Sequence, residues 1–549
     1  MTEPTRPLPK PTLDDAGHWH STSTLSPKSM TTRAAISLPP DRVMPVIIVP
    51  GIMGTNLRAT TDPSHPQNQE LAPGEIAWRP PNGNIDAAKA VKKWNGRNPS
   101  QRQYVLAPDT LEVDDGGEID PSLLSAFDGL DKALAQARWW GEIHWDSYGQ
   151  LLTTLEHNLN KTFLILRGGR AITEHWVRVN QCDRNLWGAS STSLTAPLTA
   201  TEFEKFASYH YPVYACGYNW LQSNEESVKR LAQRIDDILQ FWSSRRQTCT
   251  QVILVTHSMG GLVARACARQ MEDKIAGVIH GVMPALGAPA CYRRIACGTE
   301  SSNPSNGKIG NGKAWAFSII AGESAALTTP VMAVAPGPLE LLPNHLYPRP
   351  WLFATGPASR EGRLDYVPLA VTNPYDLYRE TSSWYRLIDP SKADPANKYK
   401  GKVMETVKKA VKQAERFHKE VLETYYHPKS FAYYCDDPAQ LTFGAFRWQC
   451  DSSLAGKSSA DVNAAKLESS TFQDNRNVSF FDGSTGYFRP MAQDAAGDGT
   501  VPLQSSSAPS GKVLQLFATR GYDHQSSYRN EAMLALTQHL IVKIVQGVS

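Results

Sequence analysis

The sequence predicts an α/β protein built on a mostly parallel, doubly wound sheet with large insertions. Short apolar runs of strand length alternate along the chain with longer segments whose apolar residues recur at helical spacing. Strands that are apolar on both sides are typical of parallel sheets with helices on both faces. The order strand, helix, strand, helix, strand then favours right-handed crossovers within one sheet.

Length, charge and composition indicate a large globular protein. The chain has 549 residues, of which 41% are hydrophobic and 20% charged, so it can bury a full core. The formal net charge of +3 argues against a nucleic-acid-binding surface. No apolar run reaches the roughly 18 residues that a membrane-spanning helix needs. We therefore expect one domain with insertions, which could contact a membrane only at its surface.

Residues 1–42 form a polar leader that is rich in proline, serine and threonine, and we expect it to be flexible. The leader lacks the apolar core of a secretory signal peptide. The protein is therefore expected to be made in the cytoplasm and not to use ordinary signal-dependent export.

The first half of the predicted sheet begins with the apolar run Val43–Val49, which ends in a Pro-Gly turn. A helix at Trp145–Leu159 and a strand at Pro212–Tyr218 follow. The next amphipathic helix, Glu226–Trp242, carries its apolar residues on one face. It leads into a second set of elements, which are a strand at Val252–Val255, a helix at Met259–Arg269 and a strand at Ile275–Met283.

The alternation breaks after residue 289, so we assign 43–289 and 490–549 to the catalytic core and 290–489 to a cap or lid insertion. Loops rich in glycine, asparagine and proline dominate this insertion, together with one long helix at Val403–Tyr425. Packing of that helix against the core is the simpler interpretation, and a membrane-facing lid helix is the alternative. A last strand at Val513–Ala518 and a helix at Tyr528–Val545 complete the core.

Eight cysteines are too sparse for a disulfide scaffold and lack the paired spacing of a metal site, so no metal or cofactor is expected. Two pairs could close loops in an oxidising compartment, and free thiols are the default for all. These pairs are Cys291 with Cys297 and Cys435 with Cys450.

Ser258 is the candidate nucleophile. It stands in Thr-His-Ser-Met-Gly-Gly, directly after the apolar run that ends at Val255 and before an amphipathic helix. This arrangement matches the nucleophile elbow of the α/β-hydrolase fold, in which small neighbours allow a strained strand-to-helix turn. The structural alternative is a tight turn without chemistry.

The oxyanion formed during ester cleavage needs two N–H donors. In this fold one donor comes from the loop after an early strand, and Pro50-Gly51-Ile52-Met53-Gly54 follows the first strand here. Ile52 is the first candidate and Met53 the next. Met259, directly after the serine at a helix N-terminus, is the second donor. The alternative is a glycine turn that only closes the strand.

Asp498 and His524 complete the predicted triad, because α/β-hydrolases place the acid and then the histidine after the nucleophile. Asp498 lies between two glycines before the last strand, and His524 follows that strand. His524 would take the proton of Ser258, and Asp498 would hold the imidazole tautomer and stabilise its cation.

Several residues compete for these roles. Asp365, Asp482 and Asp523 are alternative acids, although Asp523 is expected to face away or to cap the following helix. His539 lies inside the last helix and reads as an ordinary helical residue. His257, beside the nucleophile, is expected to pack or to line the substrate site.

Five segments together resemble the lecithin:cholesterol acyltransferase-like lipases and the related GPI-inositol-deacylase-like enzymes. They are Pro50–Gly54, Gly217–Trp220, Thr256–Gly261, Pro336–Pro343 and Gly497–Val501. The resemblance implies Ser258, Asp498 and His524 as the triad, and Ile52 with Met259 as the oxyanion donors. These are the residues that the motifs themselves indicate. Asn219 stands where these enzymes often have aspartate, and Thr256 where they often have glycine.

In lacking a signal peptide and in having large insertions, the chain also resembles the antibacterial phospholipase effectors of bacterial type VI secretion. This resemblance implies a phospholipid substrate, delivery into a target cell by a signal-independent route, and a cognate immunity protein as inhibitor. Two other functions stay open. An acyltransferase would use the same site with an alcohol in place of water, and a binding protein would use the fold without activity.

Overall fold

The computed structural model describes residues 11–22, 38–125, 130–166, 169–188, 194–358, 365–471 and 474–548. Its centre is a six-stranded sheet in which every neighbouring pair of strands is parallel. In sheet order the strands are β11 (Val213–Ala215), β4 (Val46–Val49), β12 (Val252–His257), β13 (Ile275–Gly281), β16 (Ser430–Cys435) and β23 (Gln515–Thr519). The predicted doubly wound α/β fold is confirmed.

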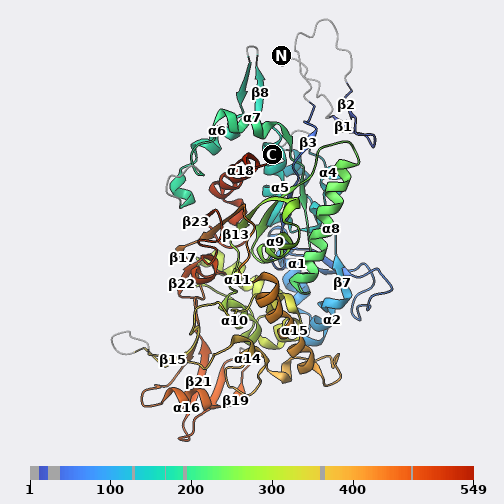
Figure 1. Ribbon diagram of the computed structural model, residues 1–549. Coiled ribbons are helices and arrows are strands. Elements are labelled where there is room, and N and C mark those ends of the chain that lie inside the picture. The colour runs from blue at the N-terminus through green and yellow to red at the C-terminus, as the bar shows by residue number, and fades with distance from the viewer. Residues whose placement is uncertain are drawn as a thin grey trace.

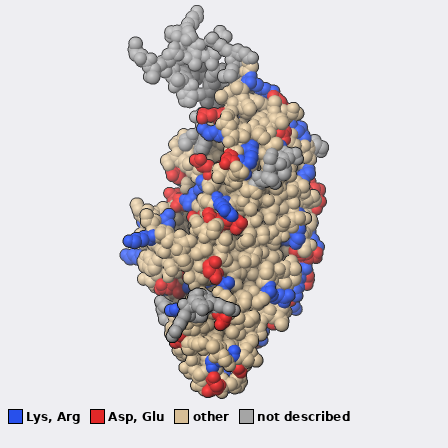
Figure 2. Space-filling model, turned by 90° about the vertical axis from the view of Figure 1, so that its left-hand side faces the viewer, with Lys and Arg blue, Asp and Glu red and all other residues tan. Residues whose placement is uncertain are grey.

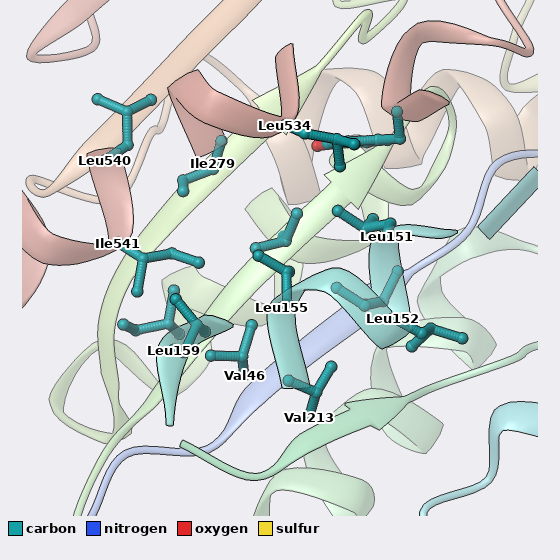
Figure 3. Close-up of a cluster of buried hydrophobic side chains, with 14 of the residues drawn as sticks. Val46, Leu151, Leu152, Leu155, Leu159, Val213, Ile279, Leu534, Leu540 and Ile541 are labelled. Carbon is teal, nitrogen blue, oxygen red and sulfur yellow. The ribbon is translucent and has the colours of Figure 1, made fainter. Parts of the chain in front are cut away.

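Side chains of the central strands alternate between two apolar cores. In β4, Val46 and Ile48 join the core beneath α5 (Trp145–Leu159) and α18 (Glu531–Gln546), whereas Ile47 and Val49 join the core beneath α8 (Asn224–Ser243) and α9 (Gly260–Gln270). Figure 3 shows the first core, in which leucines of α5 lie close to Val46 and Val213, and Ile279 lies close to leucines of α18. Because helices cover both faces, the strands read as continuous apolar runs.

One central strand, β16, was not predicted from the sequence. β16 lies within the segment 290–489 that was assigned to the insertion, yet it pairs with β13 on one side and β23 on the other. Its sequence, Ser-Phe-Ala-Tyr-Tyr-Cys, is rich in the aromatic residues that strands favour, so β-propensity was the available signal. The assignment of the whole of 290–489 to a cap is therefore corrected, because the chain returns to the sheet at residue 430.

The insertion also builds a second six-stranded sheet of mixed direction at one end of the molecule (Figure 1). A third apolar core lies between this sheet and the neighbouring helices. Its strands, in sheet order, are β15 (Tyr366–Pro368), β14 (Leu352–Thr355), β18 (Phe446–Cys450), β21 (Thr485–Pro490), β20 (Arg476–Ser479) and β19 (Lys466–Ser470).

The long helix predicted at Val403–Tyr425 is α15 (Val403–Arg416), continued by a π-helical turn, η6 (Phe417–Leu422). Val403, Val407, Ala410 and Ala414 of its apolar stripe are buried in the third core. Lysines 408, 409 and 412 on the other face are exposed. The packing interpretation is therefore confirmed, and this stripe does not face a membrane.

Part of the leader that was expected to be flexible is packed in place. Residues 12–20 form a hairpin of β1 (Thr12–Leu13) and β2 (Trp19–His20). The ring of Trp19 meets His210 edge to face, 5.9 Å between centroids. Gly17 has a φ of 85°, and a Cβ there would lie 2.0 Å from the carbonyl oxygen of Arg245. Residues 1–10 and 23–37 lie outside the described residues.

Shorter elements surround the three cores. Before α9 the helices are α1 (Gly83–Asn95), α2 (Pro99–Val105), α3 (Pro121–Ser125), α4 (Lys132–Ala137), α6 (Glu174–Gln181) and α7 (Ala200–Ala207). After β13 they are α10 (Pro289–Cys297), α11 (Lys308–Ala321), α12 (Ala325–Met332), α13 (Pro336–Leu339), α14 (Pro374–Arg379), α16 (Ser459–Ala464) and α17 (Leu503–Ser506). Isolated 3₁₀ turns are η1 (Pro108–Thr110), η2 (Trp140–Glu142), η3 (Arg184–Trp187), η4 (Glu272–Lys274), η5 (Pro390–Lys392) and η7 (Ser527–Arg529).

Small sheets complete the fold. They are β5 (Leu57–Ala59) with β6 (Ile76–Trp78) and β7 (Leu111–Val113), β8 (Phe163–Leu166) with β9 (Gly169–Ile172), β10 (Tyr209–His210) with β3 (Arg42–Val43), and β17 (Asp437–Thr442) with β22 (Ala495–Gly497). All eight cysteines are free thiols, so neither of the two considered pairs is bonded. None of the described helices has both the length and the apolar character needed to cross a bilayer. On the face in Figure 2, acidic and basic side chains are interspersed.

Leu155 tests the contribution of the first core. Its side chain is fully buried between α5 and the sheet, so Leu155→Ala should leave a cavity and lower the free energy of unfolding by about 2–5 kcal/mol. Urea denaturation followed by circular dichroism measures this change. Leu514→Ala is the matched control, because Leu514 is 52% exposed and its truncation should change stability little. Equal losses in the two variants would contradict this account of the core.

Candidate active site

Ser258 occupies a strained turn between β12 and α9, as the sequence predicts. Its φ is 52°, in the left-handed region that a non-glycine residue adopts only at an energetic cost. The N–H of Ser258 donates to the carbonyl of Gly281 at 2.9 Å, which ties the turn to β13. A Cβ at Gly260 would lie 2.4 Å from the Val49 carbonyl oxygen and 2.5 Å from that of Pro50. Glycine at 260 therefore lets the elbow approach the end of β4.

The structure brings the three predicted triad residues together. Nε2 of His524 lies 2.8 Å from Oγ of Ser258, and Nδ1 of the same ring lies 2.7 Å from Oδ2 of Asp498. One imidazole thus faces a hydroxyl with one nitrogen and a carboxylate with the other. This geometry can move a proton from the serine to the histidine while the carboxylate stabilises the resulting imidazolium.

Asp498 is fixed by its own turn. Its side chain is buried, and Oδ1 accepts the backbone N–H of Thr500 at 2.9 Å and of Val501 at 2.6 Å. Its carbonyl accepts the N–H of His524 at 2.8 Å. Gly499 has a φ of 87°, which explains why glycine follows the acid. With Oδ1 occupied by the backbone, Oδ2 is left for the imidazole.

The loop after β4 is held by hydrogen bonds that use its other polar groups. The carbonyl oxygen of Pro50 accepts a hydrogen bond from the Tyr218 hydroxyl at 2.8 Å. The carbonyl oxygen of Met53 accepts one from the indole N–H of Trp78, also at 2.8 Å. The N–H of Gly51 donates to Tyr148 Oη at 2.9 Å. Among the hydrogen bonds of the described residues, none uses the N–H of Ile52 or of Met259. Both predicted oxyanion donors are therefore unoccupied.

The loop also lies directly against the nucleophile. A Cβ at Gly51 would come within 2.9 Å of the Cβ of Ser258 and 2.8 Å of Nδ1 of His257. Ser258 itself is only 4% exposed. The candidate site is thus enclosed, and electrostatic interactions within it are less screened than at the surface.

His257 packs beside the nucleophile, as expected of a residue at this position, and makes two polar contacts that the sequence did not indicate. Its Nε2 lies 2.8 Å from the carbonyl oxygen of His524, and its Nδ1 lies 2.9 Å from Tyr148 Oη. Burial, with the neighbouring His524, lowers the pKa of His257 to about 3. Tyr148 belongs to no motif, because only the folded chain brings α5 to this loop.

The competing residues lie elsewhere. Oδ1 of Asp523 accepts the N–H of Ser526 at 2.9 Å, so this acid caps a turn as anticipated. Asp482 pairs with Lys457 at 2.7 Å, and Asp365 directly precedes β15 in the second sheet. His539 is buried in α18, where Nε2 lies 2.7 Å from the carbonyl oxygen of Leu194. None of these contacts involves Ser258.

The two residues that depart from the lipase motifs, Asn219 and Thr256, both make hydrogen-bond contacts. Nδ2 of Asn219 donates to the carbonyls of Pro108 and Leu111 at 3.0 and 3.1 Å, so it joins two chain segments. Oγ1 of Thr256 lies 3.2 Å from Nδ1 of His280, beneath the elbow.

Within the described part of the chain, no group of three or more His, Cys, Asp or Glu side chains is arranged to hold a metal ion.

Comparison with known families finds a match for one part of the chain. Residues 215–298, which run from the end of β11 through Ser258 to α10, match the PGAP1-like alpha/beta domain. Residues 215–298 are therefore similar to a PGAP1-like alpha/beta domain. No curated protein matches the chain. Ser258 and Met259 lie inside the matched residues. Ile52, Asp498 and His524 lie outside them.

A solved structure extends the likeness over most of the chain. The chain is similar to one in the crystal structure of the Tle4–Tli4 complex, with a TM-score of 0.73 and 27% sequence identity. The match covers 92% of this chain and 99% of that one. The shared fold therefore includes the second sheet and not only the PGAP1-like domain.

Gly260→Ala tests the close approach of the elbow. The added Cβ would meet two backbone carbonyl oxygens that side-chain motion cannot remove, so stability should fall by roughly 1–3 kcal/mol or more. Thermal unfolding monitored by calorimetry measures the change. Gly312→Ala in α11 is the control, because apart from its chain neighbours and its own helix backbone no atom lies within 4 Å of the Cβ position. An unchanged melting temperature in Gly260→Ala would contradict the packing described.

Acid should destabilise the fold through His280. Burial, followed by the nearby Arg265 cation, lowers its pKa from 6.5 to about 3. Because the unfolded chain binds the proton more tightly, the stabilising contribution is complete above pH 6.5 and is lost as pH falls towards 3. Between these values the slope approaches about 1.4 kcal/mol per pH unit.

Urea denaturation of wild type and His280→Asn between pH 7 and pH 4 measures this contribution. The free energy of unfolding of the variant should depend less steeply on pH than that of wild type. Parallel curves would show that His280 is not held neutral by the fold.

Proposed function

We propose that the chain is a serine esterase that hydrolyses ester-linked lipids, in its most concrete form a phospholipase. The observation that carries the proposal is the position of one imidazole, His524, between Ser258 Oγ and Asp498 Oδ2 at 2.8 and 2.7 Å. A serine and histidine in contact, with a buried carboxylate on the second ring nitrogen, are the groups that acyl transfer requires.

The reaction would proceed through an acyl-enzyme. Oγ of Ser258 attacks the ester carbonyl as Nε2 of His524 takes its proton, and the oxyanion accepts the N–H groups of Ile52 and Met259. Collapse of this intermediate expels the alcohol, which receives the proton from His524. Water, deprotonated by the same nitrogen, then releases the fatty acid and restores Ser258. Each missing oxyanion donor costs about 10²–10³ in kcat in related chemistry.

A lipid ester suits an enclosed site. Ser258 is 4% exposed, so the substrate must be drawn away from water to reach it, and transfer of an acyl chain into an apolar environment is favourable. The motifs that resemble lecithin:cholesterol acyltransferase-like lipases support the same substrate class. The PGAP1-like domain around Ser258 supports hydrolase chemistry.

The wider role that we propose is that of an antibacterial toxin. The sequence resembles type VI secretion phospholipase effectors, and the chain is similar to one found in the Tle4–Tli4 complex. We propose signal-independent delivery into a target cell, where the enzyme acts on phospholipid at a membrane surface. A cognate immunity protein would bind the enzyme and protect the producing cell, as a complex between two proteins suggests.

The first test is hydrolysis of phospholipid vesicles and short-chain esters by wild type, with the released fatty acid identified by mass spectrometry. Ser258→Ala and His524→Ala should each reduce kcat by several orders of magnitude, because either loss disables nucleophilic attack. Ser430→Ala is the matched control. It removes another buried serine hydroxyl, on β16, that donates to the His427 carbonyl, and it should retain activity.

The products separate the alternatives. Free fatty acid from wild type alone supports hydrolysis and reveals which acyl position is cut. Ester transferred to an added alcohol in preference to water would replace the hydrolase by an acyltransferase. Equal rates in wild type and Ser258→Ala would remove Ser258 from the mechanism, and no turnover in any variant would favour the binding protein.

A further inference from the structure

A chain of three hydrogen bonds connects the oxyanion loop, residues 50–54, to the backbone of the proposed base, His524. It begins at the N–H of Gly51, which donates to Tyr148 Oη at 2.9 Å. It continues from Tyr148 Oη to Nδ1 of His257 at 2.9 Å. It ends at Nε2 of His257, 2.8 Å from the carbonyl oxygen of His524. The proposed mechanism uses neither the Tyr148 nor the His257 side chain.

The two ends of this chain fix the direction of the outer bonds, and with a neutral imidazole they also fix the direction of the middle one. A carbonyl oxygen only accepts, so Nε2 of His257 must carry the hydrogen that it shares with His524. The backbone N–H of Gly51 only donates, so Tyr148 Oη accepts there and has its own hydrogen left for Nδ1 of His257. Of the two neutral tautomers of His257, only the Nε2–H form satisfies all three bonds.

The surroundings keep His257 in that state. It is 5% exposed, and Tyr148, Tyr528 and His524 surround its ring, with centroids at 5.6, 6.1 and 5.0 Å. Asp498 is the nearby carboxylate, and it is already engaged by His524 and two backbone N–H groups. Burial and the neighbouring His524 lower the pKa of His257 to about 3, so it stays uncharged when His524 becomes cationic.

Both ends of the chain lie next to groups that the reaction uses. Gly51 directly precedes Ile52, the proposed oxyanion donor, and the His524 carbonyl belongs to the proposed base. The same helix makes a parallel contact, because Ser147 Oγ, one residue before Tyr148, accepts Nε2 of Gln525 at 3.0 Å. The first turn of α5 is therefore bonded to both loops.

We infer that Tyr148 and His257 are positioning residues. They hold the oxyanion loop and the loop that carries His524 at a fixed separation on either side of the nucleophile. This inference rests on the proposed function. It assigns to the histidine beside Ser258 a role in geometry and not in proton transfer. Small displacements matter at such a site, because a 1 Å misplacement can cost about 10²-fold in rate.

Tyr148→Phe is the most selective test, since it removes one oxygen and leaves Gly51 N–H and His257 Nδ1 without their partner. We expect kcat for ester hydrolysis to fall about 10- to 100-fold, less than for loss of an oxyanion donor, with KM changed little. A merely structural hydroxyl would not divide kcat from KM in this way.

Tyr211→Phe is the matched control. It also deletes a buried hydroxyl, one that donates to the Phe206 carbonyl at 2.7 Å near β10, away from Ser258. Both variants should lose similar thermal stability, and only Tyr148→Phe should lose kcat. Equal kcat in the two variants, or a kcat loss that simply follows melting temperature, would overturn the inference.

A double variant tests whether the two residues act as one unit. His257→Gln keeps a donor that can reach the His524 carbonyl and lacks the Nδ1 acceptor for Tyr148. If the residues act through one chain, the loss of kcat in Tyr148→Phe/His257→Gln should be smaller than the product of the two single losses. Independent, multiplicative losses would overturn the coupling.

The proposed function and the present inference fail in different ways. Wild-type turnover that is equal to that of Ser258→Ala removes the proposed function, and the inference with it. Ser258-dependent turnover that is unaffected by Tyr148→Phe leaves the esterase in place and removes only the positioning role.

Discussion

The close approach of the Ser258 turn to the end of β4 is the constraint on which the rest of the site depends. Glycine at 260 allows the turn to come against the carbonyls of Val49 and Pro50, and glycine at 51 brings the facing loop against the serine side chain. A parallel, fully buried sheet provides this geometry, because neighbouring strands end at the same edge. The positive φ of Ser258 is sustained by the packing around it.

Backbone groups do most of the work of holding the site together. Asp498 is oriented by two N–H groups of its own turn, and its carbonyl fixes the backbone of His524. Tyr148 and His257 then join the loops on either side of the nucleophile. These contacts are all buried or partly buried, so they are shielded from competing water.

The central strands and the turn at Ser258 could be predicted from the sequence because their signals are local. Apolar runs such as 252–255 and the small residues around Ser258 reflect the strand and turn that they form. The order of serine, acid and histidine then selects Asp498 and His524 among several candidates. Strand β16 was not predicted, because its six residues mix aromatic and small side chains and show no alternation of apolar and polar residues. Without that alternation they could not be told from a loop that follows a long insertion.

The sequence by itself determined the fold class, the elbow and the candidate triad, since each depends on residues that are adjacent or follow a fixed chain order. Only the tertiary structure decided that β16 enters the central sheet, that residues 12–20 form a hairpin whose Trp19 contacts His210, and that Tyr148 contacts His257. These contacts join segments far apart in the chain, and no local pattern of polarity encodes which distant surface a residue will meet. Burial and hydrogen-bond satisfaction, which select such contacts, are properties of the folded molecule.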